Sequence, residues 1–208
     1  MTSPADAARA DGEPVQHQRG RPRARKSSKH ITEPQAQNLS DALAFADEIG
    51  LRLNVAIDIF WLMFFGSADD RTRLVRCQER LSKWCKRRDF PLAMIWVREI
   101  GRNGGPHVHI LMHVPSWLMD NGEFQCALEN SLEPDGGPSH EKAIMIKPAY
   151  APDGKLRYNL KGILRRCAKQ FHVRASPQGE IEGKRVGCTE NIGPRARSKF
   201  VPRSRTGH

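Results

Sequence analysis

The feature that most constrains the fold is a pair of apolar segments on either side of a glycine-rich turn. Residues 91–101 ("PLAMIWVREIG") and 107–114 ("HVHILMHV") are rich in large apolar side chains, and "RNGG" at 102–105 lies between them. Asn-Gly sequences between such segments favour tight hairpin turns. We therefore predict two adjacent antiparallel strands that pair symmetrically about Asn103.

Two histidines in the second strand are candidate metal ligands. Alternate side chains of a strand share a face, so His107 and His109 point the same way, and the predicted pairing places Glu99 opposite His107. Two imidazoles and a carboxylate on one face suit a divalent metal. A slip of one residue would turn Glu99 to the other face. The alternatives are a strand whose histidines bind nothing and a glutamate that pairs with Arg98 or Arg102.

A third histidine in the same strand does not fit this site. His113 has the same parity as His109, but four residues of strand separate them by roughly 13 Å. One ion cannot span that separation, so we expect His113 to be a structural or DNA-facing residue.

The remaining segments predict an α+β fold with a mainly antiparallel central sheet flanked by helices. The domain organisation we predict is a disordered basic tail at 1–36, a catalytic domain at 37–175 and a weakly structured, basic, Gly- and Arg-rich extension at 176–208. Apolar periodicity predicts further helices at 38–50 (with Ser40 as N-cap), 69–89, 116–132 and 156–171, and further strands at 51–65 and 143–150.

The positive charge is concentrated at the ends of the chain. Residues 1–30 have a net charge of +4 and residues 155–208 of +11, whereas residues 31–154 have −4. This distribution favours a polyanionic partner, nucleic acid before membrane, over a merely solubilising tail. The segment "RGRPRARK" at 19–26 is similar to the core of an AT-hook, which would place Arg19, Arg21 and Arg23 in the minor groove of DNA. A generic basic linker is the alternative.

The sequence also predicts the compartment. The five cysteines include no CxxC pair, which argues against a disulfide framework and a zinc ribbon. The first residues contain no apolar signal-peptide core, and no apolar run approaches the roughly 20 residues that span a bilayer. We therefore expect a cytoplasmic protein that does not enter a membrane.

One of the two tyrosines is a candidate nucleophile. Tyr158 and Lys161, in "RYNLKG", lie three residues apart and would share one face of a helix. A phenolate beside positive charge and a metal suits attack on a phosphodiester. The alternative is a core or surface tyrosine on a basic helix. Tyr150 is separated from Tyr158 by Pro152 and Gly154, which favours a single nucleophile.

Together, these motifs resemble the HUH endonuclease superfamily, which includes rolling-circle replication initiators (Rep proteins). "HVH" is similar to the His-hydrophobe-His motif, Glu99 to the acidic residue that completes the metal site, and "YNLK" to the Tyr-x-x-Lys motif. The wider segments "WVREIGRNGGPHVHILMHVP" and "GKRVGCTENIG" resemble small bacterial and phage replication-associated proteins. Asp58 departs from the pattern, because the first motif usually contains threonine. Asp58 could approach the metal or DNA, or it could have a structural partner.

The resemblance implies a fold related to the ferredoxin-like one and a metal-dependent endonuclease that nicks and joins DNA. Tyr158 would attack single-stranded or origin DNA and form a 5′-phosphotyrosine link, as in rolling-circle replication of a plasmid or phage. Glu99, His107 and His109 would hold Mg²⁺ or Mn²⁺, and Lys161 would assist at the phosphate. The expected DNA-backbone contacts are Arg165, Arg166 and Lys169.

The same resemblance leaves other functions open. They are a single-tyrosine HUH transposase, a non-catalytic DNA-binding relative and a metal-dependent hydrolase without covalent catalysis. The sequence contains no GxxxxGK[ST] phosphate loop of the helicase type, so we expect a host helicase and polymerase as partners.

Overall fold

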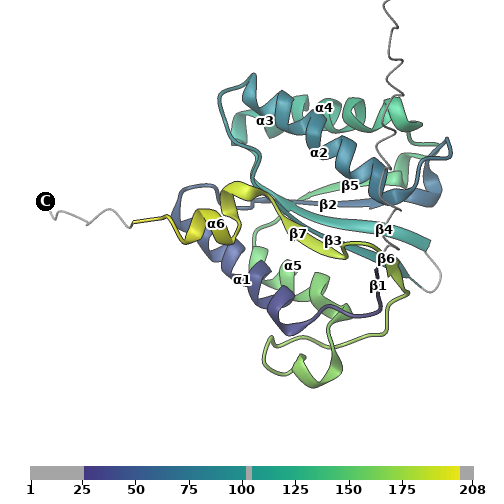
Figure 1. Cartoon of the computed structure of the whole chain (residues 1–208). Helices are drawn as coiled ribbons and strands as arrows, with labels where there is room; N and C mark the ends of the chain where they lie inside the picture. Colours follow the sequence, from purple (N-terminus) through teal and green to yellow (C-terminus); the bar gives the residue numbers. More distant parts are fainter. Residues whose placement is uncertain (1–25, 102–104, 202–208) are drawn as a thin grey trace, which may run out of the picture.

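The computed structural model describes residues 26–101 and 105–201, which form a five-stranded antiparallel sheet packed between helices (Figure 1). The predicted α+β class with a mainly antiparallel sheet is confirmed. The strand order is β5–β2–β4–β3–β7, and two short strands, β1 and β6, pair separately. The strands are β1 (Ser27–Ser28), β2 (Val55–Phe60), β3 (Met94–Gly101), β4 (Gly105–Met112), β5 (Ile144–Pro148), β6 (Ile181–Glu182) and β7 (Val186–Cys188).

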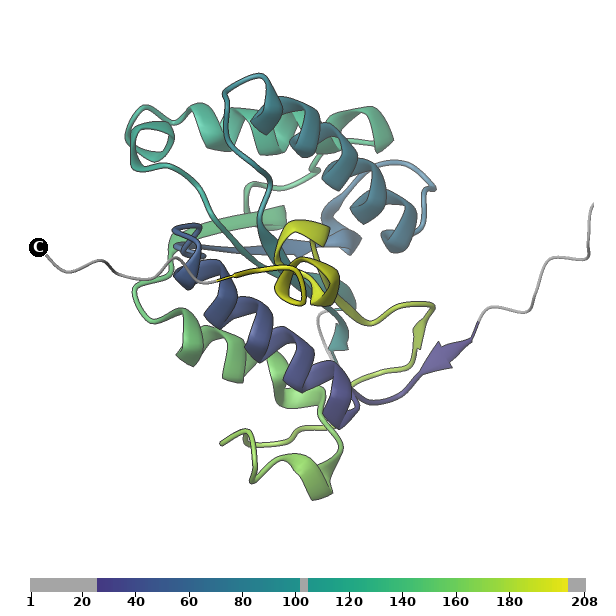
Figure 2. The ribbon, with the colours of Figure 1, turned by 60° about the vertical axis from the view of Figure 1, so that its left-hand side comes forward.

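Helices cover both faces of the sheet. Figures 1 and 2 show α2, α3 and α4 on one face and α1 and α5 on the other. Each face has its own apolar core, because alternate side chains of the strands point to opposite sides. No helix within the described ranges is long and apolar enough to cross a membrane. The helices are α1 (Glu33–Glu48), α2 (Asp70–Lys86), α3 (Ser116–Asp120), α4 (Glu123–Leu132), α5 (Pro152–Asn159) and α6 (Pro194–Arg197).

The predicted hairpin has the predicted register. Glu99 pairs with His107, and Gly101 pairs with Gly105, so the strands are symmetric about position 103, which itself lies outside the described residues. Gly105 has a positive φ of 61°, and a Cβ there would lie 2.2 Å from Leu62 Cδ1. The turn therefore requires glycine at this position.

The first helix begins earlier than predicted. Thr32 is the N-cap of α1 and forms a capping box with Gln35, whereas the Ser40 hydroxyl donates to the Ala36 carbonyl inside the helix. The prediction of Ser40 as N-cap is therefore wrong. The prediction of disorder is also wrong for residues 27–36, because the capping box starts the helix there and Ile31 is fully buried.

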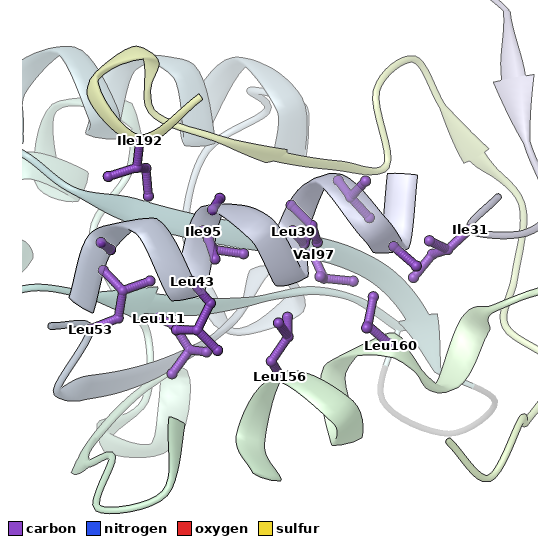
Figure 3. Packing of buried hydrophobic residues seen from close by; sticks show 14 of the residues in the cluster. Ile31, Leu39, Leu43, Leu53, Ile95, Val97, Leu111, Leu156, Leu160 and Ile192 are labelled. Carbon is purple, nitrogen blue, oxygen red and sulfur yellow. The ribbon is translucent and has the colours of Figure 1, made fainter. Parts of the chain in front are cut away.

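The core beneath α1 and α5 supports the face of the sheet that contains the metal-ligand candidates. Leu39 and Leu43 of α1 and Leu156 of α5 pack against the sheet (Figure 3). Their contacts include Val97 and Leu111, which have the same strand parity as Glu99 and His109. Apolar packing therefore gives way to polar side chains along one face, towards the β3–β4 turn.

The segment after α5 differs from the predicted helix at 156–171. The α-helix ends at Asn159, a 3₁₀ turn follows at Leu160–Gly162, and Ile163 is extended with ψ of 151°. Ile163 forms a bridge to Ile31, and both side chains are buried. Burial of this pair overrides the helical periodicity of the sequence. The exposed residues Arg165, Arg166 and Lys169 consequently do not share a helix with Tyr158.

Two other predicted boundaries are wrong. The strand predicted at 51–65 is shorter, because a 3₁₀ turn at Trp61–Met63 follows β2. The weak structure predicted after residue 176 is not observed over 181–197, where β7 pairs with β3 and α6 follows. Burial of Val186 and Ile192 in the core fixes this segment.

Candidate metal centre and tyrosine site

Three side chains converge at the end of the sheet beside the β3–β4 turn. The Nε2 atoms of His107 and His109 lie 3.2 and 3.3 Å from Glu99 Oε2. All three residues are buried, and their ligand atoms lie within 4.8 Å of one another. Two donors on one ion at bond lengths of about 2.1 Å lie about 3.0–3.4 Å apart. The three residues, called the triad below, form a candidate metal-binding site.

Both histidines are oriented through their other ring nitrogen. His109 Nδ1 lies 2.5 Å from Asp58 Oδ1, and His107 Nδ1 lies 3.0 Å from the Gly105 carbonyl oxygen. Neither acceptor has a hydrogen, so each Nδ1 donates and each Nε2 lone pair faces the triad. The ring of Phe60 stacks on His107 at 5.6 Å. These contacts match the outer-shell partners that fix metal-binding histidines in proteins.

Asp58, the position that departs from the family pattern, connects the triad to the tyrosine helix. It lies on β2 opposite His109, and its two oxygens accept from Lys155 Nζ at 3.1 and 3.2 Å. Lys155 is on α5, three residues before Tyr158, and its Nζ lies 5.3 Å from the tyrosine ring centroid. The structural-partner alternative for Asp58 is therefore the one observed.

Hydrogen bonds and charges keep Glu99 ionised despite its burial. Burial alone raises the pKa of this carboxyl, but hydrogen bonds from His107 and His109, the charge of His109 and a hydrogen bond from Lys161 together lower it far below its usual range. Lys161 Nζ lies 2.9 Å from Glu99 Oε2. Glu99 Oε1 is buried without a hydrogen-bond partner among the described residues. An ionised oxygen without a partner fits a cation ligand, which supports the triad as a metal site.

Two basic groups have raised pKa values. Burial lowers the pKa of His109, but its hydrogen bonds to Asp58 and Glu99 and the charges of both carboxylates outweigh burial. Burial likewise lowers the pKa of Lys161, which the hydrogen bond and charge of Glu99 raise above its usual value. Without a metal, His109 therefore tends to hold a proton that an ion at Nε2 would displace.

Tyr158 lies next to the triad. Its ring centroid is 5.9 Å from that of His109, and Lys161 Nζ lies 4.3 Å from the tyrosine ring centroid. The side chain is 56% exposed, so a polymer can reach it from solvent. Tyr150 is 87% exposed, and no ring contact with the triad is recorded for it among the described residues. The structure therefore brings one of the two tyrosines, together with a lysine, to the metal-ligand candidates.

Other residues singled out in the sequence lie elsewhere or outside the described ranges. His113 Nδ1 donates to the Arg52 carbonyl at 2.9 Å, which is a structural contact. Arg19, Arg21 and Arg23 lie outside the described residues. Lys155 was missed, although the spacing of three residues that linked Tyr158 to Lys161 applies equally to it. The contact of Asp58 with His109 could not be predicted without knowing that β2 lies beside β4.

An α+β domain with a buried triad and an adjacent tyrosine is the class that fold and site define. Residues 66–166, just under half of the chain, match the family model of replication-associated proteins of the ORF2 type. The matched stretch includes the triad, Tyr158 and Lys161, but not Asp58. The protein is therefore a replication-associated, Rep-like protein. Neither a comparison with curated proteins nor one with solved structures gave a match.

Proposed function

We propose that this protein is a metal-dependent HUH-type endonuclease that nicks and rejoins single-stranded DNA during rolling-circle replication. The observation that supports it most is the contact between Tyr158 and His109, which puts a nucleophile beside the triad. The match to a replication-associated family supports the role in replication. Single-stranded origin DNA is the substrate we propose, with a host helicase and polymerase as partners.

In this reaction Tyr158 Oη attacks a phosphodiester. The new bond joins Oη to phosphorus, and the bond from phosphorus to the 3′ oxygen breaks. The phenolic proton passes to solvent, and the leaving oxygen takes up a proton to become a 3′-hydroxyl. The product is a 5′-phosphotyrosine link that a 3′-hydroxyl can later reverse, which permits joining.

The triad would hold Mg²⁺ or Mn²⁺, which supplies Lewis-acid polarisation of the phosphate when bound. Glu99 provides the negative charge of the site, and the two Nε2 atoms provide neutral donors whose direction Asp58 and Gly105 fix. Lys161 Nζ, between Glu99 and the tyrosine ring, would neutralise charge on the phosphate as it develops.

Lys155 would position the nucleophile rather than contact DNA. Its bonds to Asp58 connect α5 to the strand that orients His109. The nucleophile and a metal ligand would thus be coupled through two residues. Arg165, Arg166 and Lys169 are exposed and available to the DNA backbone. The basic tail with Arg19, Arg21 and Arg23 would add salt-dependent affinity.

A covalent-adduct assay tests the proposal. The protein is incubated with end-labelled single-stranded DNA and Mn²⁺, and a denaturing gel separates labelled protein from free DNA. We expect an adduct that chelation abolishes and that Tyr158→Phe loses while Tyr150→Phe keeps it. Cleavage that survives Tyr158→Phe would favour a metal-dependent hydrolase, and binding without cleavage a non-catalytic relative. A single-tyrosine transposase would give the same adduct, and joining of two donor ends rather than one circle would identify it.

A further inference from the structure

A cavity opens beside Tyr158 on the side of the chain that follows α5. It has a volume of about 500 Å³ and lies between Arg157 and Tyr158 of α5, Lys161 and the segment 172–177. The Ser176 amide donates to the Lys161 carbonyl at 2.7 Å, which attaches this segment to the tyrosine turn. Figure 2 shows the light-green chain after α5 projecting below α1 and α5.

The rim of this cavity is basic. Arg157, Lys161, His172 and Arg174 line it, and no carboxylate does. In the part of the chain that the structure describes, no ion pair joins Arg157 or Arg174 to an acidic residue, whereas Lys161 pairs with Glu99. Two exposed guanidinium groups are therefore available to an anion.

The rest of the lining is apolar or neutral. Val173, Ala175 and Pro177 form it together with the ring of Tyr158. The volume falls in the range of about 300–1,000 Å³ that small-molecule sites occupy. An apolar wall with a cationic rim matches a nucleotide, which has a flat base that stacks and a charged phosphate.

We propose that this cavity holds the nucleotide whose 5′ phosphate becomes linked to Tyr158, with Arg174 and Arg157 binding the next phosphate along that strand. The proposal rests on the proposed function. In an in-line displacement the leaving 3′ oxygen departs on the side of phosphorus opposite the attacking oxygen, so the released strand points away from the tyrosine. The nucleotide that remains attached stays on the tyrosine side, where the cavity is.

A first experiment measures binding without chemistry. Tyr158→Phe protein is titrated with 5′-phosphorylated trithymidylate labelled at its 3′ end, and fluorescence anisotropy gives Kd. We expect Arg174→Ala to weaken binding at least about fivefold, the loss of one charge-assisted phosphate contact. Arg195→Ala, which removes an exposed arginine on α6, is the matched control and should change Kd less than about twofold. Equal effects of the two substitutions, or no binding, would overturn the subsite.

A second experiment reads the position directly. Protein with Tyr158 intact forms adducts on a randomised single-stranded pool, and both linked and released strands are sequenced. Ala175→Trp, which fills the cavity, should lower adduct yield about tenfold or more and alter the base composition at the first linked nucleotide. The composition of the released strand should stay the same. Changes confined to the released strand would place the cavity on the wrong side of the cleaved bond. Absence of any adduct would refute the proposed function, while the binding experiment would still decide on the subsite.

Discussion

The role of Asp58 in metal binding leads to a quantitative prediction. In Asp58→Asn the amide oxygen still accepts from His109 Nδ1, so the ring keeps its direction but loses its charged partner. A hydrogen bond to a charged group contributes about 1.5–3 kcal/mol and a neutral one about 0.5–1.5 kcal/mol, a difference of about 1–2 kcal/mol. This difference corresponds to roughly 5- to 30-fold weaker Mn²⁺ binding. Asp58→Ala removes the acceptor and should lose about 10- to 100-fold.

The assay is titration of Mn²⁺ into metal-free protein, with the paramagnetic resonance signal of free Mn²⁺ as readout. Asp58 also raises the pKa of His109, so a measurement at pH 8 keeps proton competition small. The matched control is Asp153→Asn, which removes the same charge from an exposed position in the first turn of α5. If Asp58→Asn binds Mn²⁺ within twofold of the unmodified protein while Asp58→Ala remains folded and equally tight, the orientation argument is wrong.

Three further predictions concern the site and the fold. Mn²⁺ affinity should rise between pH 6 and pH 8, because the raised pKa of His109 means that a proton competes at the lower pH; a flat profile by calorimetry would count against His109 as a ligand. Lys161→Met should reduce adduct formation at least about tenfold while Mn²⁺ affinity stays equal or increases, because Lys161 competes for Glu99; a parallel loss of both would make Lys161 merely structural. Leu111→Ala, at a fully buried position, should lower the free energy of unfolding by about 2–5 kcal/mol in urea, and a loss below 1 kcal/mol would contradict the assigned core.

The hairpin and its metal-ligand candidates could be predicted because they depend on local information. The turn sequence sets the register, and the register decides that Glu99 and His107 face each other. Tyr158 could be singled out by its chemistry and its spacing from Lys161. All of these inferences use residues that are neighbours in sequence or across one turn.

The missed features depend on contacts between distant segments. Ile163 is extended because it pairs with Ile31, more than a hundred residues earlier, and this ends the helix that its own neighbours favour. Asp58 contacts His109 because β2 pairs with β4. Val186 joins the sheet through β3, although its flanking glycines and arginines indicate a loop. Local periodicity contains no information on such pairings.

The most direct test of the central claim is the position of the ion. Crystals soaked in Mn²⁺ and measured at the manganese absorption edge give an anomalous peak that locates it without prior assumptions. The structure predicts one peak bonded to both Nε2 atoms of His107 and His109 and to a Glu99 oxygen, each at about 2.1–2.2 Å, with the Tyr158 hydroxyl on the open side. A peak at other residues, or none at saturating Mn²⁺ with the triad hydrogen bonds unchanged, would contradict the claim.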